Sequence, residues 1–301
     1  MSMKSLNRST AFYLKPVIEM KVKSIMTPDP VVIELPATRS YALELFKKHK
    51  VRSFPVVRRG NKELVGIVSI KRVLVNPDED QLAMLVKRDV PVVKPTDDLK
   101  KAVRLMLDYD YRRVIVVNDD GKVVGILTVG DIIRRYLAKN EKYRNVEIEP
   151  YYQRNVSVVW KGTPLKAALK ALLLCNAMAI PVIDDDGNLV GIVDETDLLK
   201  DSEVVRVMKS SALSVSSEEE WILESNPTLL FEKAELQLPK KPVEDIMTKN
   251  PIIATPHMSV YDVANKMAKY KIEQLPVIKG EGDLVGLIRD MDLIKVIVNR
   301  R

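Results

Sequence analysis

Residues 113–131 read RVIVVNDDGKVVGILTVGD, and this stretch decides the fold. Two runs rich in β-branched residues flank an Asp-Asp-Gly turn, which is the pattern of a β-hairpin. The following TVGDIIRRYL (residues 128–137) predicts a short helix. Upstream, VPVVKP (residues 90–95) predicts a strand that proline ends, and Thr96 or Asp97 is expected to cap a helix. The predicted order is therefore β-α-β-β-α.

The same pattern occurs four times along the chain. In the copy above, one helical face carries Leu99, Ala102, Val103 and Met106. The aligned helix positions of the four copies are Ala42, Ala102, Ala168 and Val263. Each copy continues with an apolar run that opens at Pro55, Ile115, Pro181 and Pro276. A glycine then follows, at Gly66, Gly125, Gly191 and Gly286. Six residues after the glycine come Arg72, Asp131, Asp197 and Asp292. Matched spacings indicate four copies of one supersecondary unit.

These copies define the predicted domain organisation of an α/β (α+β) protein. The predicted segments are an N-terminal arm at 1–20, repeats at 21–80, 81–140, 146–200 and 243–301, and an inserted helical linker at 201–242. A unit of roughly 50–60 residues buries too little apolar surface to be stable alone, so we expect the repeats to pair.

The insert is too apolar for a disordered linker, because Trp221 and Ile222 are followed by Leu229, Leu230 and Phe231. Ser217 and Glu220 have the spacing of a helix capping box. Two roles stay open for the insert. It packs across the paired repeats, or it forms a docking surface for a partner or a second subunit.

Composition sets the broad class. The 301 residues are 46% apolar and 30% charged, as in soluble globular proteins. The sequence shows no long uncharged apolar window and no secretory signal, and it has a single cysteine, Cys175, which suits a reducing cytoplasm. We therefore expect a soluble, cytoplasmic protein without membrane contact. The net charge of +7 is dispersed, so binding to nucleic acid is permitted but not indicated.

The sequence does not predict an enzyme. Its two histidines, His49 and His257, and its one cysteine do not form a nucleophilic or zinc-binding pattern, and no catalytic or metal-binding residue is expected. A glycine-rich phosphate loop is absent as well. The acidic run at 184–187, DDDG, lies where a hairpin turn is predicted, so turn chemistry explains it better than a metal site.

Two short motifs resemble those of the CBS domain. Ile-Met-Thr occurs at 25–27 and 246–248, and the glycine-to-aspartate motif is complete at 125–131, GILTVGD. The resemblance covers residues 21–138, 146–200 and 243–298. It implies two Bateman modules, each a pair of repeats, that form a disc-like assembly. It also implies similarity to the gamma subunit of AMP-activated protein kinase and to stand-alone archaeal CBS proteins. Such proteins bind AMP, ADP, ATP or S-adenosylmethionine between paired repeats, need no obligatory cofactor, and regulate rather than catalyse.

The residue types support such a ligand independently. An aspartate at the start of a helix after a buried strand presents fixed acceptor oxygens to a ribose diol, at about 1.5–3 kcal/mol for each charge-assisted hydrogen bond. A threonine three residues earlier caps the helix, and the helix N-terminus favours phosphate. The short apolar strands offer a slot for adenine.

The resemblance implies that the aspartate of one repeat acts with the first strand of its partner. For the first cleft, the implied ligand-binding residues are Asp131, Thr128, Ile126, Thr27, Val32, Arg52, Arg112 and Arg113. Arg52 and Arg112 occupy matching positions before their apolar runs, and guanidinium groups there would clamp a phosphate. We therefore expect this cleft to favour phosphorylated ligands.

The second implied cleft has a different charge. Its residues are Asp197, Asp194, Ile192, Thr248, Ile253, Ile272 and Glu273. Glu273 stands where the first two repeats have arginine, and Asp194 stands at the threonine position. Extra carboxylates repel phosphate in a partly desolvated cleft, so we expect the cationic S-adenosylmethionine or a related thioether nucleoside here.

Two positions depart further from the family pattern. Asp292 would act near Gln153, Val158 and Met178, with Arg289 at the threonine position available to a phosphate. At the fourth position Arg72 replaces the aspartate, and a cation cannot accept a hydrogen bond from a ribose diol. We therefore predict that this cleft does not hold a nucleoside in the usual pose.

The sequence thus predicts a sensor that reports adenosyl ligands to an unknown protein target. The alternative is a scaffold or nucleic-acid-interacting protein that uses the repeats without a physiological nucleotide. The choice among the four ligands, the partner and the oligomeric state, including a homodimer, stay open.

Overall fold

The computed structural model describes residues 20–49, 51–76, 78–194, 197–198, 203–211 and 229–299. The chain forms two compact units. The first contains the residues up to 141 together with those from 294 on, and the second contains residues 142–293. The expected arm at 1–20 lies almost entirely outside the described residues.

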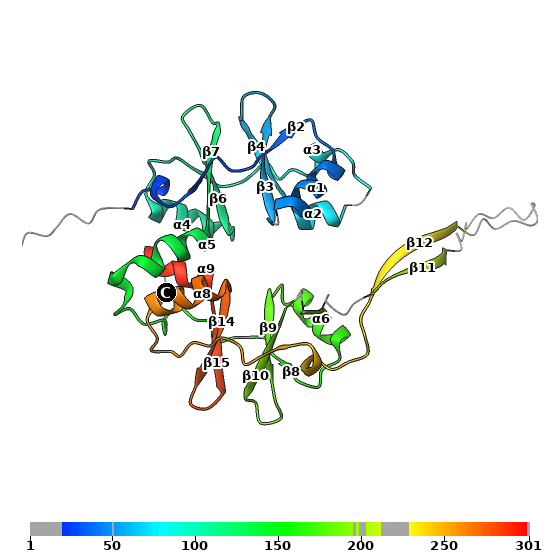
Figure 1. Ribbon diagram of the computed structural model, residues 1–301, viewed down its shortest axis with the longest axis vertical. Helices are drawn as coiled ribbons and strands as arrows, with labels where there is room; N and C mark the ends of the chain where they lie inside the picture. Colours follow the sequence, from blue (N-terminus) through cyan, green and yellow to red (C-terminus); the bar gives the residue numbers. More distant parts are fainter. Residues whose placement is uncertain are drawn as a thin grey trace, which may run out of the picture. The chain divides into compact units, whose positions relative to one another are not determined.

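The first unit contains two small sheets that lie side by side, with helices on their outer flanks (Figure 1). One sheet has the order β1-β7-β6-β5, formed by Thr27–Pro28, Val123–Thr128, Arg113–Val117 and Val92–Val93. The other has the order β2-β3-β4, formed by Ile33–Leu35, Ser53–Arg58 and Leu64–Ser69. The α-helices are α1 (Arg39–His49), α2 (Ile70–Leu74), α3 (Leu82–Leu85), α4 (Leu99–Asp108) and α5 (Val129–Arg135). The 3-10 helices are η1 (Val22–Ser24), η2 (Leu137–Lys139) and η5 (Ile294–Val298).

The second unit repeats this design. Its sheets have the orders β13-β10-β9-β8 and β14-β15. The strands are β8 (Val159–Trp160), β9 (Ala179–Ile183), β10 (Leu189–Asp194), β13 (Thr248–Lys249), β14 (Gln274–Lys279) and β15 (Asp283–Arg289). The helices are α6 (Leu165–Leu174), α8 (Val260–Tyr270), α9 (Asp290–Leu293) and η4 (Val243–Asp245), and η3 (Glu141–Tyr143) spans the residues at which the chain passes from the first unit to the second.

The predicted β-α-β-β-α order is confirmed. The strand before the first helix pairs in parallel with the strand after it, as β2 does with β3, β5 with β6, and β8 with β9. The fourth repeat reduces this strand to a parallel bridge between Ala254 and Val277. An antiparallel hairpin then follows in every repeat.

Paired repeats exchange their leading segments. β1 of the first repeat pairs with β7 of the second, and β13 of the fourth pairs with β10 of the third. The leading segments of the other two repeats pair with their partners through single β-bridges. These join Ile67 to Lys87 and Gln153 to Leu287. Each leading segment therefore extends the sheet of its partner repeat.

The glycine of each repeat permits this exchange. A Cβ on Gly125 would lie 2.6 Å from the Met26 sulfur and 3.2 Å from the Thr27 carbonyl oxygen. Gly191 faces Met247 and Thr248 in the same way, and Gly286 faces Tyr152 and Gln153. Only a residue without a side chain leaves room for the incoming segment at this distance.

The core follows the sequence pattern. The predicted helical face of Leu99, Ala102, Val103 and Met106 is buried on α4. A separate apolar cluster joins the two sheets of the first unit through Val57, Ile67, Ile115 and Val123, and Val32 and Ile126 pack against it. The expected cap of α4 was wrong by one residue. Asp98 accepts from the Lys100 amide, whereas Asp97 accepts from the amide of Lys94.

The helical linker predicted at 201–242 was wrong for the described part of the insert. Glu203–Ser211 (β11) and Leu229–Gln237 (β12) form a regular antiparallel pair. β11 contains three valines, and β-branched residues favour strands over helices, which the helical prediction undervalued. The capping-box pair Ser217 and Glu220, together with Trp221, lies outside the described residues.

No helix in the described part of the chain has the length and apolarity needed to span a membrane.

Replacing Gly286 with alanine tests the exchange of leading segments. The new methyl group would overlap the Gln153 carbonyl and the Tyr152 ring, where Gln153 and Leu287 exchange two backbone hydrogen bonds of 2.9 Å. We expect the free energy of unfolding to fall by about 1–3 kcal/mol, measured by urea denaturation. Gly130→Ala is the matched control, since the atoms nearest to its methyl group would belong to the exposed guanidinium of Arg134. Equal stability of the two variants would contradict the account.

Candidate ligand-binding site

The equivalent polar position of each repeat lies where the second hairpin strand turns into a helix. In the second repeat, the Thr128 hydroxyl accepts from the Asp131 amide at 3.1 Å. The Asp131 Oδ2 in turn accepts from the Thr128 amide at 3.1 Å and from its hydroxyl at 2.5 Å. Asp131 is 3% exposed, so this capping box fixes a buried carboxylate at the start of α5.

The other oxygen of Asp131 faces two arginines of the same helix. Arg134 donates to Oδ1 at 3.2 Å, and an Arg135 nitrogen lies 3.7 Å from it. Arg135 also donates to the carbonyl oxygens of Ile25 and Met26 at 2.9 and 2.8 Å. Arg135 therefore ties the aspartate of the second repeat to the leading segment of the first.

The structure brings the remaining residues of the first predicted cleft into the same unit. Thr27 is paired with Ile126 across β1 and β7, three residues before the start of α5. Val32 and Ile126 pack on the apolar cluster between the two sheets, as a slot for an adenine ring requires.

The three predicted arginines lie where the paired sheets meet. The Arg52 carbonyl accepts from the first amide of α2, and the Arg112 carbonyl accepts from that of α5, each at 3.0 Å. This confirms that the two residues occupy matching positions. The Arg113 guanidinium donates to the hydroxyl of Ser53, the neighbour of Arg52 in the partner repeat. The strand entries of both repeats, with their arginines, therefore lie together.

The second predicted cleft has the same frame with acidic residues. Asp197 is 5% exposed, its amide donates to Asp194 Oδ1 at 2.8 Å, and its Oδ2 accepts from the Asp194 amide at 3.2 Å. Thr248 pairs with Ile192 as Thr27 does with Ile126. Ile253 and Ile272 are half-buried. The Glu273 carbonyl accepts from the first amide of α9, which places Glu273 at the position of Arg52 and Arg112.

The third predicted aspartate is already paired within its own repeat. Asp292 is fully buried, and Arg289 donates to both of its oxygens, at 2.9 and 3.3 Å. Gln153 donates to the same carboxylate at 3.2 Å, as the predicted pairing with the third repeat requires. Met178 is half-buried, and Val158 is exposed. Arg289 was expected to be available to a phosphate. In the structure, its guanidinium is instead paired with the Asp292 carboxylate.

The fourth position keeps the cap but not the carboxylate. The Ser69 hydroxyl accepts from the Arg72 amide at 3.3 Å, and the Arg72 side chain is exposed.

Sequence reasoning missed Arg134, Arg135, Ser53 and Gln274 as residues that hold the sites together. Arg134 and Arg135 stand three and four residues after Asp131, a spacing that places side chains on one helical face and was a usable signal. Gln274 donates to the Ala179 carbonyl at 3.1 Å, which joins the paired repeats of the second unit as Arg113 and Ser53 join the first. No local pattern in the sequence marks such a contact.

The acidic run at 184–187 forms a hairpin turn, as predicted. Asp184 accepts from the amides of Asp186 and Asn188. Hydrogen bonds from Lys161 and Trp160 lower the pKa of the Asp185 carboxyl.

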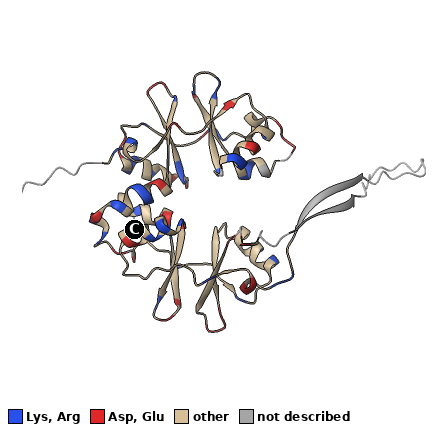
Figure 2. Cartoon of the chain, viewed as in Figure 1, with Lys and Arg blue, Asp and Glu red and all other residues tan. Residues whose placement is uncertain are grey.

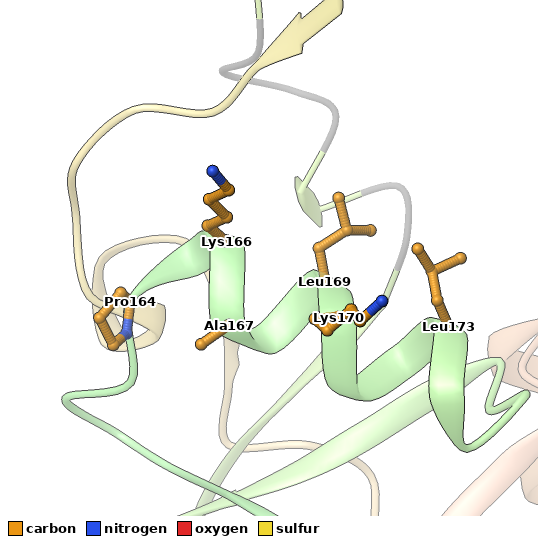
Figure 3. A pocket seen from close by; sticks show the side chains of 6 residues that line it. All are labelled: Pro164, Lys166, Ala167, Leu169, Lys170 and Leu173. Atoms are coloured by element: carbon orange, nitrogen blue, oxygen red, sulfur yellow. The ribbon is translucent and has the colours of Figure 1, made fainter.

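An apolar hollow of about 520 Å³ lies on the outer side of α6 and involves none of the predicted ligand-binding residues. Leu169 and Leu173 project from this side of the helix, beside Lys166 and Lys170 (Figure 3). Basic and acidic residues are interspersed along the chain in both units (Figure 2).

The chain belongs to the CBS domain family, and the family model, CBS domain, matches residues 22–77, 82–138, 148–217 and 243–299. It is therefore a protein of four CBS repeats. A solved structure of an uncharacterized conserved protein from Pyrococcus horikoshii is 58% identical and has a TM-score of 0.70, covering 92% of this chain and all of the other.

Two relatives come from Methanocaldococcus jannaschii. The structure of MJ1225, proposed to be an archaeal homologue of g-AMPK, matches with a TM-score of 0.65 at 21% identity and covers 92% of this chain and 100% of the other, which shows a shared fold. Uncharacterized protein MJ1404 is 28% identical over 279 residues, which are 92% of this chain but only 62% of MJ1404. The chain thus spans about three fifths of that relative.

Replacing Arg289 with methionine should destabilise the protein by leaving the buried Asp292 without its guanidinium. We expect a loss of about 1–3 kcal/mol in thermal or urea unfolding, less than for a fully buried pair because Arg289 is 42% exposed. Adding Asp292→Asn should recover part of the loss. Arg58→Met is the control, since its ion pair with Glu63 is exposed. An unchanged stability of Arg289→Met would show that this pair does not stabilise the fold.

Proposed function

We propose that the chain is a regulatory protein that binds adenosyl ligands between paired CBS repeats and does not catalyse a reaction. The observation that carries the proposal is the exchange of leading segments, which sets Thr27 beside the strand that leads into the Asp131 cap. The first unit then combines three features for one ligand. They are the apolar slot at Val32 and Ile126, the fixed carboxylate of Asp131, and the three arginines at the strand entries.

In this proposal, Asp131 binds the ribose. Its Oδ2 is engaged by the cap, so Oδ1 is the oxygen that a ribose hydroxyl meets. Arg134 now donates to Oδ1, and its side chain is 54% exposed. An exposed arginine is free to rotate, so Arg134 can leave Oδ1 to the sugar and turn toward a phosphate.

Arg52, Arg112 and Arg113 supply the positive charge that favours AMP, ADP or ATP in this cleft. They enter from both repeats, so a phosphate bound among them would link the two. A ligand that bridges the repeats stabilises their closed arrangement, and a protein partner that distinguishes this arrangement would read the ligand state.

The Asp197 cleft would take S-adenosylmethionine or a related thioether nucleoside. Asp194 and Asp197 cap each other in this frame, and the backbone of Glu273 holds the position that Arg52 and Arg112 hold in the first unit. A cationic sulfonium and ammonium suit this charge, whereas a phosphate does not. The Asp292 position ranks third, because Arg289 already occupies its carboxylate.

Isothermal titration calorimetry with AMP, ADP, ATP and S-adenosylmethionine tests the proposal. Asp131→Asn should weaken nucleotide binding by at least about tenfold, since it alters a charge-assisted hydrogen bond worth about 1.5–3 kcal/mol. Asp262→Asn is the matched control. Asp262 forms the same kind of cap with Ser259 on α8, with bonds of 2.7 and 3.0 Å, but lies outside the predicted clefts.

Three outcomes would contradict the proposal. The first is that none of the four ligands binds to ligand-free protein. The second is that Asp131→Asn and Asp262→Asn lose the same amount of nucleotide affinity. The third is that Asp131→Asn binds nucleotides as the unchanged protein does. An absence of nucleotide binding together with salt-dependent binding of RNA or DNA would favour the alternative, a scaffold that contacts nucleic acid.

Replacing Glu273 with arginine tests the assignment of ligand charge. The substitution gives the second cleft the charge that Arg52 and Arg112 give the first. In Asp131→Asn protein, where the first cleft is weakened, we expect ATP to bind at least about fivefold more tightly and S-adenosylmethionine more weakly. Lys249→Arg, which conserves charge on β13, serves as the control. Unchanged ligand preference would refute the charge argument and leave the Asp131 test unaffected.

A further inference from the structure

Three metal-ligating side chains converge outside the predicted clefts. Glu147, Glu149 and His257 each offer one ligand atom, and these atoms all lie within 4.8 Å of one another. Glu147 and His257 are exposed, and Glu149 is half-buried. An imidazole among two carboxylates differs from a purely acidic surface group, because neutral imidazole selects transition metals over calcium and magnesium.

The backbone explains why these side chains meet. Ile148 is fully buried, whereas its neighbours Glu147 and Glu149 are exposed and half-buried, with carboxylate oxygens within 4.8 Å of each other. The Ile148 amide donates to the Met258 carbonyl at 3.0 Å, and the Val260 amide donates to the Val146 carbonyl at 2.7 Å. A bridge between Glu147 and Ser259 completes the pairing. These bonds hold the segment with the glutamates against the loop with His257.

The side chains already point at one another. His257 Nδ1 lies 3.1 Å from Glu147 Oε2. In a tetrahedral zinc site, with bonds of about 2.0–2.2 Å, neighbouring ligand atoms are roughly 3.3 Å apart. Movements on the order of 1 Å at the ends of these side chains would therefore reach that geometry. Arg154 competes only weakly, because its nitrogen is 3.8 Å from Glu149 at a site open to solvent.

The geometry points to a binding site for one divalent transition-metal ion, of which Zn²⁺ is the best fit, held by Glu147, Glu149 and His257 with water completing the coordination. The ion would link the leading segment of the third repeat to the loop before α8 of the fourth. The site is independent of the proposed adenosyl function, because it shares no residue with the predicted clefts.

Calorimetry and thermal unfolding with ZnCl₂ test the site. The experiment uses metal-free full-length protein carrying Cys175→Ser, because the exposed Cys175 thiol would itself bind Zn²⁺. We expect one equivalent of Zn²⁺ to bind and to raise the melting temperature. His257→Ala should lower the affinity at least tenfold, and Glu149→Gln should lower it measurably.

His49→Gln is the matched control, because His49 is the chain's other histidine and lies against Phe54 in the first unit. With two histidines, proton NMR adds a second readout, in which Zn²⁺ should shift the imidazole signal that His257→Ala removes. An absence of stoichiometric Zn²⁺ binding would overturn the inference, as would binding that His257→Ala leaves unchanged. MgCl₂ should not compete, and equal affinity for Mg²⁺ would also contradict a transition-metal site.

Discussion

The rest of the structure depends on the close approach of one repeat's leading segment to a glycine in its partner repeat. A single repeat leaves the edge of its hairpin unpaired, and unpaired strand edges are unfavourable. The partner satisfies this edge through the Thr27–Ile126 pairing in one unit and the Thr248–Ile192 pairing in the other. Gly125 and Gly191 permit the approach by presenting no side chain. Pairing of repeats is thus a property of the fold.

The same constraint creates the candidate sites. The strand that receives the partner's segment leads directly into the capped helix, so the aspartate and the foreign segment come together without a long loop. Chemistry then varies at fixed positions. The same position of the repeat carries a different group in each copy. It is Asp131 held by a threonine cap, Asp197 held by an aspartate cap, Asp292 neutralised by Arg289, and Arg72. One frame therefore presents side chains of opposite charge at the same position.

The sequence predicted what depends on local periodicity. The helical face around Ala102, the hairpins and the threonine cap at Asp131 all follow from spacings within one repeat, and the structure confirms them. Contacts between distant segments were not predictable in the same way. Nothing near Ser53 announces its contact with Arg113, and nothing near Ala179 announces its contact with Gln274. His257 seemed peripheral because its neighbours Glu147 and Glu149 lie more than one hundred residues away. The helical prediction for the insert was wrong because the capping-box spacing indicates a helix, whereas the β-branched residues of β11 favour the strand that forms.

Hydrogen exchange with and without ATP tests whether paired repeats build one ligand site jointly, because it reports each repeat separately. We expect a ligand at Asp131 to protect backbone amides on both sides of the exchanged pairing, in residues 25–33 of the first repeat and 126–133 of the second. The exposed hairpin turn at 118–122 should be unaffected. Protection confined to one of these two segments, or to neither while ATP binds, would contradict a site built jointly by paired repeats.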